Sequence, residues 1–196
     1  MAVYDLILSR RSIRQFKAKP IPKKILKKLV NAARLAPSAA NLQPLEFIVV
    51  NDENLNKAIF SCLRWAAYIS PQGNPLPGQE PTAYIVVLVN TRIRDKGFER
   101  DAGAALENMI LTAWEEGIGS CWIISIDRSR IHQILNIPEE YKVDSILALG
   151  YPAEKPVIEE MKDSVKYWKD KNGQLHVPKR NLEDIFHFNK FGSRSK

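Results

Sequence analysis

The chain has 196 residues, of which 45% are hydrophobic and 26% charged, so it is long and apolar enough for one domain with a sizeable core and is not expected to be disordered. The formal net charge is +7, with ten basic and one acidic side chain in residues 1–34, nine and four in residues 162–196, and ten and seventeen in residues 35–161. This distribution, basic at both ends and acidic between them, disfavours the continuous basic surface of a protein that coats nucleic acid.

The first ninety residues contain five predicted elements and one long loop. Pro22 suits the first position of a helix, whose apolar residues then recur at helical spacing until Pro37. Four prolines and two glycines among twelve residues predict the loop, and the β-branched run that follows is typical of a strand buried on both faces. In chain order we expect a helix over Val3–Ser9, a helix from Pro22 to Pro37, a strand over Glu46–Val50, a helix over Leu55–Tyr68, the loop Ser70–Pro81 and a strand over Tyr84–Val89.

The rest of the chain contains the strongest predicted helix, over Asp101–Glu116. Its alanines permit close approach of another helix, which makes it a candidate central or dimer helix. Further elements are expected, in chain order, as a strand over Cys121–Ile126, a helix from Asp127 to Leu135, a strand over Ser145–Leu149, a hairpin of Val165–Lys169 and Gln174–Val177, and a helix over Leu182–Asn189. No internal repeat is visible and no low-complexity linker divides the chain, so we expect a single domain over residues 1–196, with residues 190–196 as a flexible tail. Within it, helices and strands mix without a regular βαβ alternation.

The sequence predicts neither a membrane-spanning segment nor a signal peptide. The longest stretch without a charged residue, Trp65–Gln79, contains three prolines. Asp5 and Arg10 precede any long apolar run, which argues against a signal peptide. Cys62 and Cys121 are too few for a disulfide framework and lack metal-ligand spacing. We therefore expect a cytoplasmic protein with two buried, reduced thiols and no metal.

Several catalytic motifs are absent from the sequence. It contains no P-loop, and Gly117 and Gly119 follow a predicted helix rather than a strand, which does not support a Rossmann site. His132, His176 and His187 lie far apart without metalloprotease spacing, and we expect them to be ordinary surface or core residues. There is no G-x-S-x-G nucleophile elbow either. The lack of an obvious protein nucleophile is what a cofactor-dependent enzyme would show.

Two segments are chemically distinctive. Residues Arg10–Arg14 offer three guanidiniums and one hydroxyl, which can donate several charge-assisted hydrogen bonds to a phosphate or a ring oxyanion. Residues Ala36–Pro44 combine small side chains with Asn41 and Gln43, which can both donate and accept hydrogen bonds. Taken alone, the first segment also fits a solvated surface run and the second a helix-terminating turn. If the two basic ends of the chain meet in the fold, they could share one small anion, such as a single phosphate.

Together and in this order, the two segments resemble the nitroreductase family of FMN-dependent oxidoreductases. The resemblance continues through four further blocks, at Asp101–Asn108, Gly117–Ile123, Leu147–Pro152 and Val177–Asp184, and so covers nearly the whole chain. It implies an α+β, three-layer fold in which helices flank a central mixed or antiparallel sheet. It also implies an intertwined homodimer with two FMN sites at the subunit interface.

The resemblance carries over to individual residues. The positions that hold the flavin phosphate, the ribityl chain and the N1–O2 edge of the ring are matched by Arg10, Arg11, Ser12 and Arg14. A loop that the partner subunit contributes is matched by Pro37, Ser38, Ala39, Asn41 and Gln43. A segment beside the ring, whose backbone N–H near Ile124 or Ser125 approaches N5, is matched by Trp122, Ile123 and Ile124. Tail residues that return to the phosphate are matched by Lys179 and Arg180.

Three positions depart from the family's pattern. Leu45 stands where many relatives have an aromatic residue, and Ala39 and Ala40 replace neighbours that are frequently polar. These differences leave FMN as the expected cofactor and bear instead on which substrate the protein accepts.

The implied function is transfer of hydride or electrons from NAD(P)H, through flavin N5, to a nitroaromatic, a quinone or a similar electron-poor acceptor by a ping-pong mechanism. Arg14 or Arg10 would lie at the N1–O2 edge. Trp65, Tyr68 and the Ser70–Pro81 loop are candidates to cover the ring, with core packing and a plain surface loop as the alternative. Two other functions stay open: a specialised flavin chemistry, such as reductive dehalogenation or flavin fragmentation, and a non-catalytic basic module that binds nucleic acid or flavin, which the acidic middle of the chain disfavours.

Overall fold

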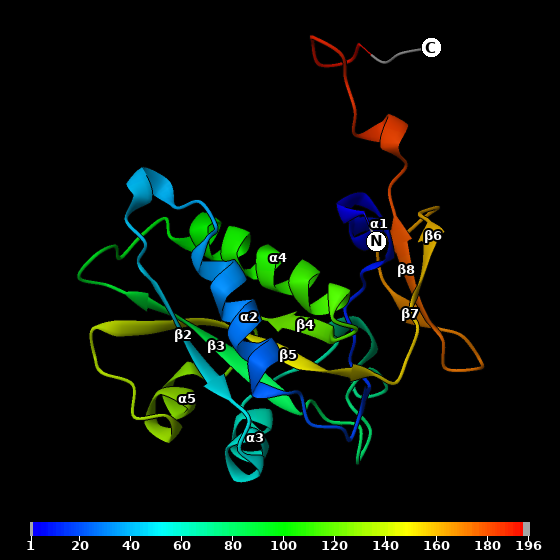
Figure 1. The fold of residues 1–196 in the computed structure, drawn as a ribbon. Coiled ribbons are helices and arrows are strands. Elements are labelled where there is room, and N and C mark those ends of the chain that lie inside the picture. The colour runs from blue at the N-terminus through cyan, green and yellow to red at the C-terminus, as the bar shows by residue number, and fades with distance from the viewer. Residues whose placement is uncertain (1, 194–196) are drawn as a thin grey trace.

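A five-stranded antiparallel sheet organises the computed structural model, which describes residues 2–193 (Figure 1). The long strand β5 (Tyr141–Pro152) pairs with β3 (Ala83–Asn90) along one side. Along its other side it pairs with β4 (Gly119–Ile123) and β1 (Phe16–Lys17). Strand β2 (Leu45–Val50) pairs with the far side of β3. Every pairing between these strands is antiparallel, so of the two arrangements expected from the sequence the structure has the antiparallel one.

Helices pack on both faces of this sheet, because successive side chains of a strand point to opposite faces. The four helices are α2 (Lys23–Arg34), α3 (Glu53–Phe60), α4 (Glu99–Glu115) and α5 (Arg128–Ile134). On one face α2 and α4 share a core with Ile85 and Leu147, and on the other α3 and α5 share a core with Tyr84 and Ile146 (Figure 1). Ala83–Val89 is buried throughout, which confirms the predicted doubly buried strand. Within residues 2–193, no helix is both long and apolar enough to cross a membrane.

A second, three-stranded sheet is formed by the C-terminal part of the chain. Strand β8 (Leu175–Lys179) pairs in parallel with β6 (Val157–Glu160) and antiparallel with β7 (Trp168–Lys169). The predicted hairpin is confirmed with a shorter first strand, and Gly173 takes a φ of +78° in its turn, where glycine is favoured. The N-terminal helix α1 (Val3–Ser9) matches its prediction. Beyond β8, the chain extends away from both sheets (Figure 1).

The prediction of one helix over Leu55–Tyr68 is wrong. Helix α3 ends at Phe60, and the chain then pairs with the segment that follows β4. There the N–H of Arg64 donates to the carbonyl of Ser125 at 3.0 Å, and the N–H of Asp127 donates to the carbonyl of Cys62 at 2.9 Å. These bonds satisfy backbone groups that a longer helix would have used internally. A separate 3₁₀ turn, Ala67–Ile69, follows Ala66, whose φ is +41°.

The predicted helix over Leu182–Asn189 is also wrong beyond its first turn. Only Leu182–Asp184 forms a helical turn, of the 3₁₀ type. The apolar side chains that follow it are exposed, so this segment lacks the packing that stabilises most helices in proteins. Of the expected tail over residues 190–196, residues 194–196 lie outside the described part of the chain.

Strand and helix boundaries elsewhere differ from the predictions by a few residues. The strand expected over Cys121–Ile126 ends at Ile123, and the one expected over Ser145–Leu149 is only the middle of β5. The short strands β1 and β6 were not predicted, because two to four residues give too little alternation to recognise.

Close packing at Gly150 gives a test of the sheet. An added Cβ there would lie 2.7 Å from Cδ1 and 2.9 Å from Cβ of Phe16, which is fully buried. We expect Gly150→Ala to lower the free energy of unfolding in urea by about 1–3 kcal/mol, the usual cost of overpacking a core. Gly103→Ala is the control, because a Cβ on that helical residue meets only Cη2 of Trp122, at 3.9 Å, and alanine favours the helix. Equal stability of the two variants would contradict the packing argument.

Cys62 and Cys121 are both buried and free. Burial is the main cause that raises the pKa of each thiol above its ordinary value. Because the thiolate is the reactive form, we expect neither cysteine to react with a disulfide reagent at pH 7 in the folded protein and both to react in guanidinium chloride. Rapid modification of either thiol in the folded protein would contradict this expectation.

Candidate functional site

The Arg10–Arg14 segment runs alongside β4. Ser12 forms a parallel bridge with Ser120, and the N–H of Ile13 donates to the carbonyl of Ser120 at 2.9 Å. Ile13 is fully buried, and the neighbouring Gly119 leaves room for it, because a Cβ at position 119 would lie 2.8 Å from Cγ1 of Ile13. The buried isoleucine therefore anchors a segment whose neighbouring polar side chains remain available to a ligand.

The two basic ends of the chain meet at one cavity. It has a volume of about 190 Å³ and is lined by Arg10, Arg11, Ser12, Arg14, Tyr167, Val177 and Lys179. Four of these residues are cationic, and none of those seven is acidic. The convergence that the charge distribution suggested is therefore present in the structure.

Two of the arginines at this cavity have distinct environments. The guanidinium of Arg11 donates to the carbonyls of Arg10 and Leu8, and its burial, followed by the charge on Arg10, lowers its pKa from the ordinary value. The Cζ atom of Arg14 lies 5.0 Å from the centroid of the Tyr167 ring, and within residues 2–193 its buried Nε has no hydrogen-bond partner. Such an unsatisfied donor among cations suits an anion with several acceptor oxygens.

The two basic residues of the C-terminal segment, Lys179 and Arg180, have different surroundings. Lys179, the last residue of β8, lines the cavity. Arg180 is not among the lining residues, and its guanidinium donates instead to the carbonyl of Asp184 at 3.1 Å. Of these two residues, the structure therefore brings Lys179, and not Arg180, to the N-terminal arginines.

The Pro37–Gln43 loop lies at a different cavity of about 150 Å³, which Pro37, Ser38 and Gln43 help to line. Asp101 on α4 holds the loop, because its Oδ1 accepts a hydrogen bond from the N–H of Ala39 at 3.1 Å. The backbone then turns sharply through three non-glycine residues of positive φ: Ala40, Asn41 and Gln43. Residues 39–43 are exposed, so their side chains are presented outwards. This loop does not line the cationic cavity of its own chain.

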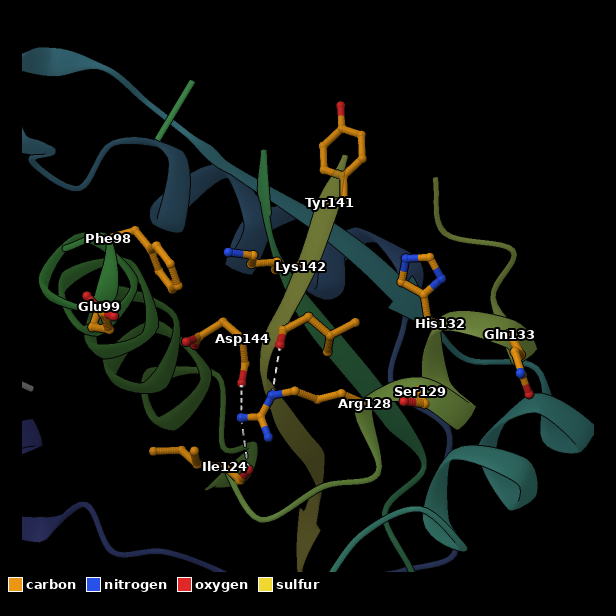
Figure 2. Close-up of a pocket in the computed structure, with 11 residues that line it drawn as sticks. Phe98, Glu99, Ile124, Arg128, Ser129, His132, Gln133, Tyr141, Lys142 and Asp144 are labelled. Carbon is orange, nitrogen blue, oxygen red and sulfur yellow. Dashed lines mark hydrogen bonds between the residues drawn. The ribbon is translucent and has the colours of Figure 1, made fainter. Parts of the chain in front are cut away.

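The segment after β4 borders a larger cavity, of about 720 Å³, between the start of α4, α5 and β5 (Figure 2). Trp122 and Ile124 are exposed, whereas Ile123 between them is buried in the core. The guanidinium of Arg128 donates to the carbonyls of Ile124 at 3.2 Å, Val143 at 3.0 Å and Asp144 at 2.9 Å. The backbone N–H of Arg64 donates to the next carbonyl, that of Ser125. Because both carbonyls accept hydrogen bonds, the orientation of the backbone at residues 124–125 is fixed.

The two aromatic candidates for covering the flavin ring have different surroundings. Trp65 is 6% exposed and packs against Phe60, with ring centroids 5.9 Å apart, so the core-packing alternative describes it. Tyr68 is 55% exposed, and its ring centroid lies 5.0 Å from that of Tyr167, the residue that contacts Arg14. The Ser70–Pro81 loop is tied to β7, because Nζ of Lys169 donates to the carbonyl of Gln72 at 2.9 Å. Tyr68 therefore packs against Tyr167, which lines the cationic cavity, whereas the loop is tied to the second sheet.

No role was predicted for Tyr167, whose ring centroid lies 5.0 Å from Cζ of Arg14, or for Asp101 as the residue that holds the Pro37–Gln43 loop. Both contacts join segments far apart in the sequence, so no local signal predicts them. His176, expected to be an ordinary residue, stacks on Trp168 with ring centroids 4.2 Å apart and places its Nδ1 3.1 Å from Oε2 of Glu159. His176 is not among the residues that line the cationic cavity.

Comparison with known proteins gives a consistent picture. Residues 7–151 match the Nitroreductase family. A protein of Archaeoglobus fulgidus, provisionally named an NADH dehydrogenase/NAD(P)H nitroreductase, is 34% identical over 157 residues, covering 76% of this chain and 85% of its own length. An NADPH-dependent oxidoreductase of Staphylococcus aureus is 25% identical over 96% of this chain and 74% of its own. The structure of an FMN-dependent nitroreductase of Clostridium difficile is 28% identical, with a TM-score of 0.68, covering 95% of this chain and 98% of that one.

Proposed function

The chain belongs to the nitroreductase family, and on this premise we propose that it is an FMN-dependent oxidoreductase that takes hydride from NAD(P)H and passes it to a nitroaromatic, a quinone or a similar electron-poor acceptor. The observation that carries the proposal is the cavity where Arg10, Arg11, Arg14 and Lys179 converge. Four cationic side chains around about 190 Å³ suit one phosphate group better than a long polyanion.

The residues at this cavity fit the phosphate end of FMN. Arg11 is buried and held by backbone carbonyls, so it supplies a fixed charge, while the Nε of Arg14 is a donor that needs an acceptor. Lys179 reaches the same cavity from the other end of the chain. We assign Arg10, Arg11, Ser12 and Lys179 to the phosphate and the ribityl chain, and Arg14 or Arg10 to the N1–O2 edge of the ring. Arg180 has a weaker case, because its guanidinium is directed to Asp184.

When bound, FMN supplies a ring that accepts hydride at N5 and passes it on. The chain's own contribution is to orient that ring and to stabilise the negative charge that accumulates at its N1–O2 edge, for which a guanidinium is suited. Trp122 and Ile124 are assigned to the ring's surroundings, beside the fixed backbone at residues 124–125. Tyr68 and the Ser70–Pro81 loop are assigned to the open side of the ring. If that side is the only one open, NAD(P)H and the acceptor must alternate there, which gives ping-pong kinetics.

The proposed active form is an intertwined, three-layer homodimer in which the Pro37–Gln43 loop of one subunit reaches the flavin of the other. Support comes from the loop's outward presentation and from its separation from the cationic cavity of its own chain. Exposed apolar side chains on α1 and beyond η3 (Leu182–Asp184) give further support, because such groups favour burial against a partner.

An absorbance spectrum of the desalted protein, followed by anaerobic addition of NADH and then NADPH, tests the proposed function. We expect a flavin band that survives desalting or returns on reconstitution with FMN and that bleaches with at least one nucleotide. Adding a nitroaromatic or a quinone should then restore the oxidised band. A protein that stays colourless after reconstitution would overturn the proposal. A bound flavin that neither nucleotide reduces would favour the specialised flavin chemistries.

A further inference from the structure

One carboxylate joins the N-terminal arginines to the end of β5. Oε1 of Glu154 accepts hydrogen bonds from the backbone N–H groups of Arg14 and Gln15, the latter at 3.2 Å. Beside it, the N–H of Ala153 donates to the carbonyl of Gln15 at 2.8 Å. Glu154 is not among the residues that line the cationic cavity. Its contact is with the backbone from which the Arg14 side chain projects, and not with the cavity itself.

Gln15 continues this contact to the Ser70–Pro81 loop. Its buried side chain donates through Nε2 to the carbonyl of Asn74 at 2.9 Å and accepts at Oε1 from the N–H of Leu76, also at 2.9 Å. The next residue, Phe16, donates its N–H to the carbonyl of Gln79 at 3.0 Å. The backbone at residues 14–15 is therefore held by Glu154 while the adjacent side chain and peptide hold the loop.

We propose that Glu154 is a positioning residue of the flavin site. By accepting from the backbone N–H groups of Arg14 and Gln15, it sets where the Arg14 guanidinium lies in the cavity and where the loop held by Gln15 meets it. The inference rests on the proposed function and adds to it a residue that acts through its neighbours' backbone.

Glu154 can act on FMN binding through its charge or through its position, and the two effects change the affinity in opposite directions. A carboxylate near a phosphate site repels the phosphate, so an effect of charge alone predicts that removing Glu154 tightens FMN binding. Loss of the hydrogen-bond acceptor instead leaves two backbone N–H groups unsatisfied and frees Arg14 to move, which weakens FMN binding. Glutamine keeps an acceptor oxygen at the same reach without the charge, whereas aspartate keeps the charge and shortens the reach.

The test compares the FMN dissociation constant and the reduction midpoint potential of bound FMN in the wild type and in Glu154→Ala, Glu154→Gln and Glu154→Asp. We expect Glu154→Ala to weaken FMN binding about tenfold or more. We also expect it to shift the potential of the remaining bound flavin to a more negative value, because a displaced guanidinium stabilises the reduced ring less well. Glu154→Gln should stay within about threefold of the wild-type affinity. Glu53→Ala, at an exposed residue of α3, is the matched control.

The outcomes separate this inference from the proposed function. A wild-type protein that binds no FMN overturns both. A wild type that binds FMN, with unchanged or tighter binding in Glu154→Ala, overturns the positioning role alone. Weaker binding with an unchanged potential also overturns it, since a role in fold stability alone would give that result. If Glu154→Ala does not fold, Glu154→Gln closer to the wild type supports the inference, and Glu154→Asp closer to the wild type overturns it.

Discussion

Replacing Arg14 by alanine is expected to weaken FMN binding by about 1.5–3 kcal/mol, the range for hydrogen bonds to a charged group. The structure gives a reason for an effect of this size. Among the described residues the Nε of Arg14 is buried without a hydrogen-bond partner, so a ligand oxygen would satisfy a donor that is already removed from water. Its Cζ lies 5.0 Å from the ring centroid of Tyr167, so the guanidinium also packs against an aromatic ring of the protein. Titration of the apoprotein with FMN, followed by quenching of the flavin fluorescence, measures the change.

Two further variants sharpen this measurement. Arg14→Lys keeps the positive charge but loses the planar donor pattern, so its affinity should lie between the wild type and Arg14→Ala. Arg92→Ala removes an arginine whose side chain is largely exposed and faces Glu140, and it should leave the affinity unchanged. Unchanged flavin retention in Arg14→Ala would refute the assignment of Arg14 to FMN.

If the proposed homodimer forms, removing residues 182–196 is expected to convert it to a monomer and to abolish stable FMN binding. The described part of this segment exposes several large apolar side chains, including Phe188 at 49% and Phe191 at 94%. Burying one such side chain fully stabilises an assembly by about 1.5–3 kcal/mol, so together they could dominate the association of two subunits. Size-exclusion chromatography with light scattering gives the oligomeric state, and the absorbance spectrum gives the flavin content.

The control for this truncation is a chain that lacks only residues 194–196, which should remain a dimer with bound FMN. A truncated chain that stays dimeric would show that the segment beyond η3 is not needed for association. A truncated chain that becomes monomeric yet keeps its flavin would place the whole FMN site within one subunit, against the proposed contribution of the Pro37–Gln43 loop.

The elements that the sequence predicted well are those whose pattern is local and long. Helix α4 and strand β3 follow from the spacing of their own apolar residues, and the structure places both in the core. The end of α3 could not be predicted in this way, because it is decided by backbone hydrogen bonds to residues about sixty positions later. The N–H of Arg64 donates to the carbonyl of Ser125, and the carbonyl of Cys62 accepts from the N–H of Asp127. Tertiary pairing outweighed a local helical pattern there.

The same distinction applies to the candidate site. The Arg10–Arg14 motif and the excess charge of the C-terminal segment are visible in the sequence, and the meeting of Arg14 with Lys179 could be suggested from them. The role of Glu154 could not be predicted from the sequence. The backbone N–H of Arg14 donates to a residue 140 positions away, and neither spacing nor composition distinguishes Glu154 from other acidic residues. Trp65 shows a different limit of sequence-based prediction. An aromatic residue beside a proline-rich loop is equally typical of a cover over a ligand and of the protein core, and the burial of Trp65 is visible only in the structure.

The position of Lys179 beside Arg10 also has a consequence for biosynthesis. During synthesis the N-terminal arginines emerge well before β8, the strand that brings Lys179 to them. Contacts so distant in sequence form slowly. Under the proposed function, a nascent chain would therefore complete its phosphate-binding cavity only after β8 has emerged and folded against the rest of the domain.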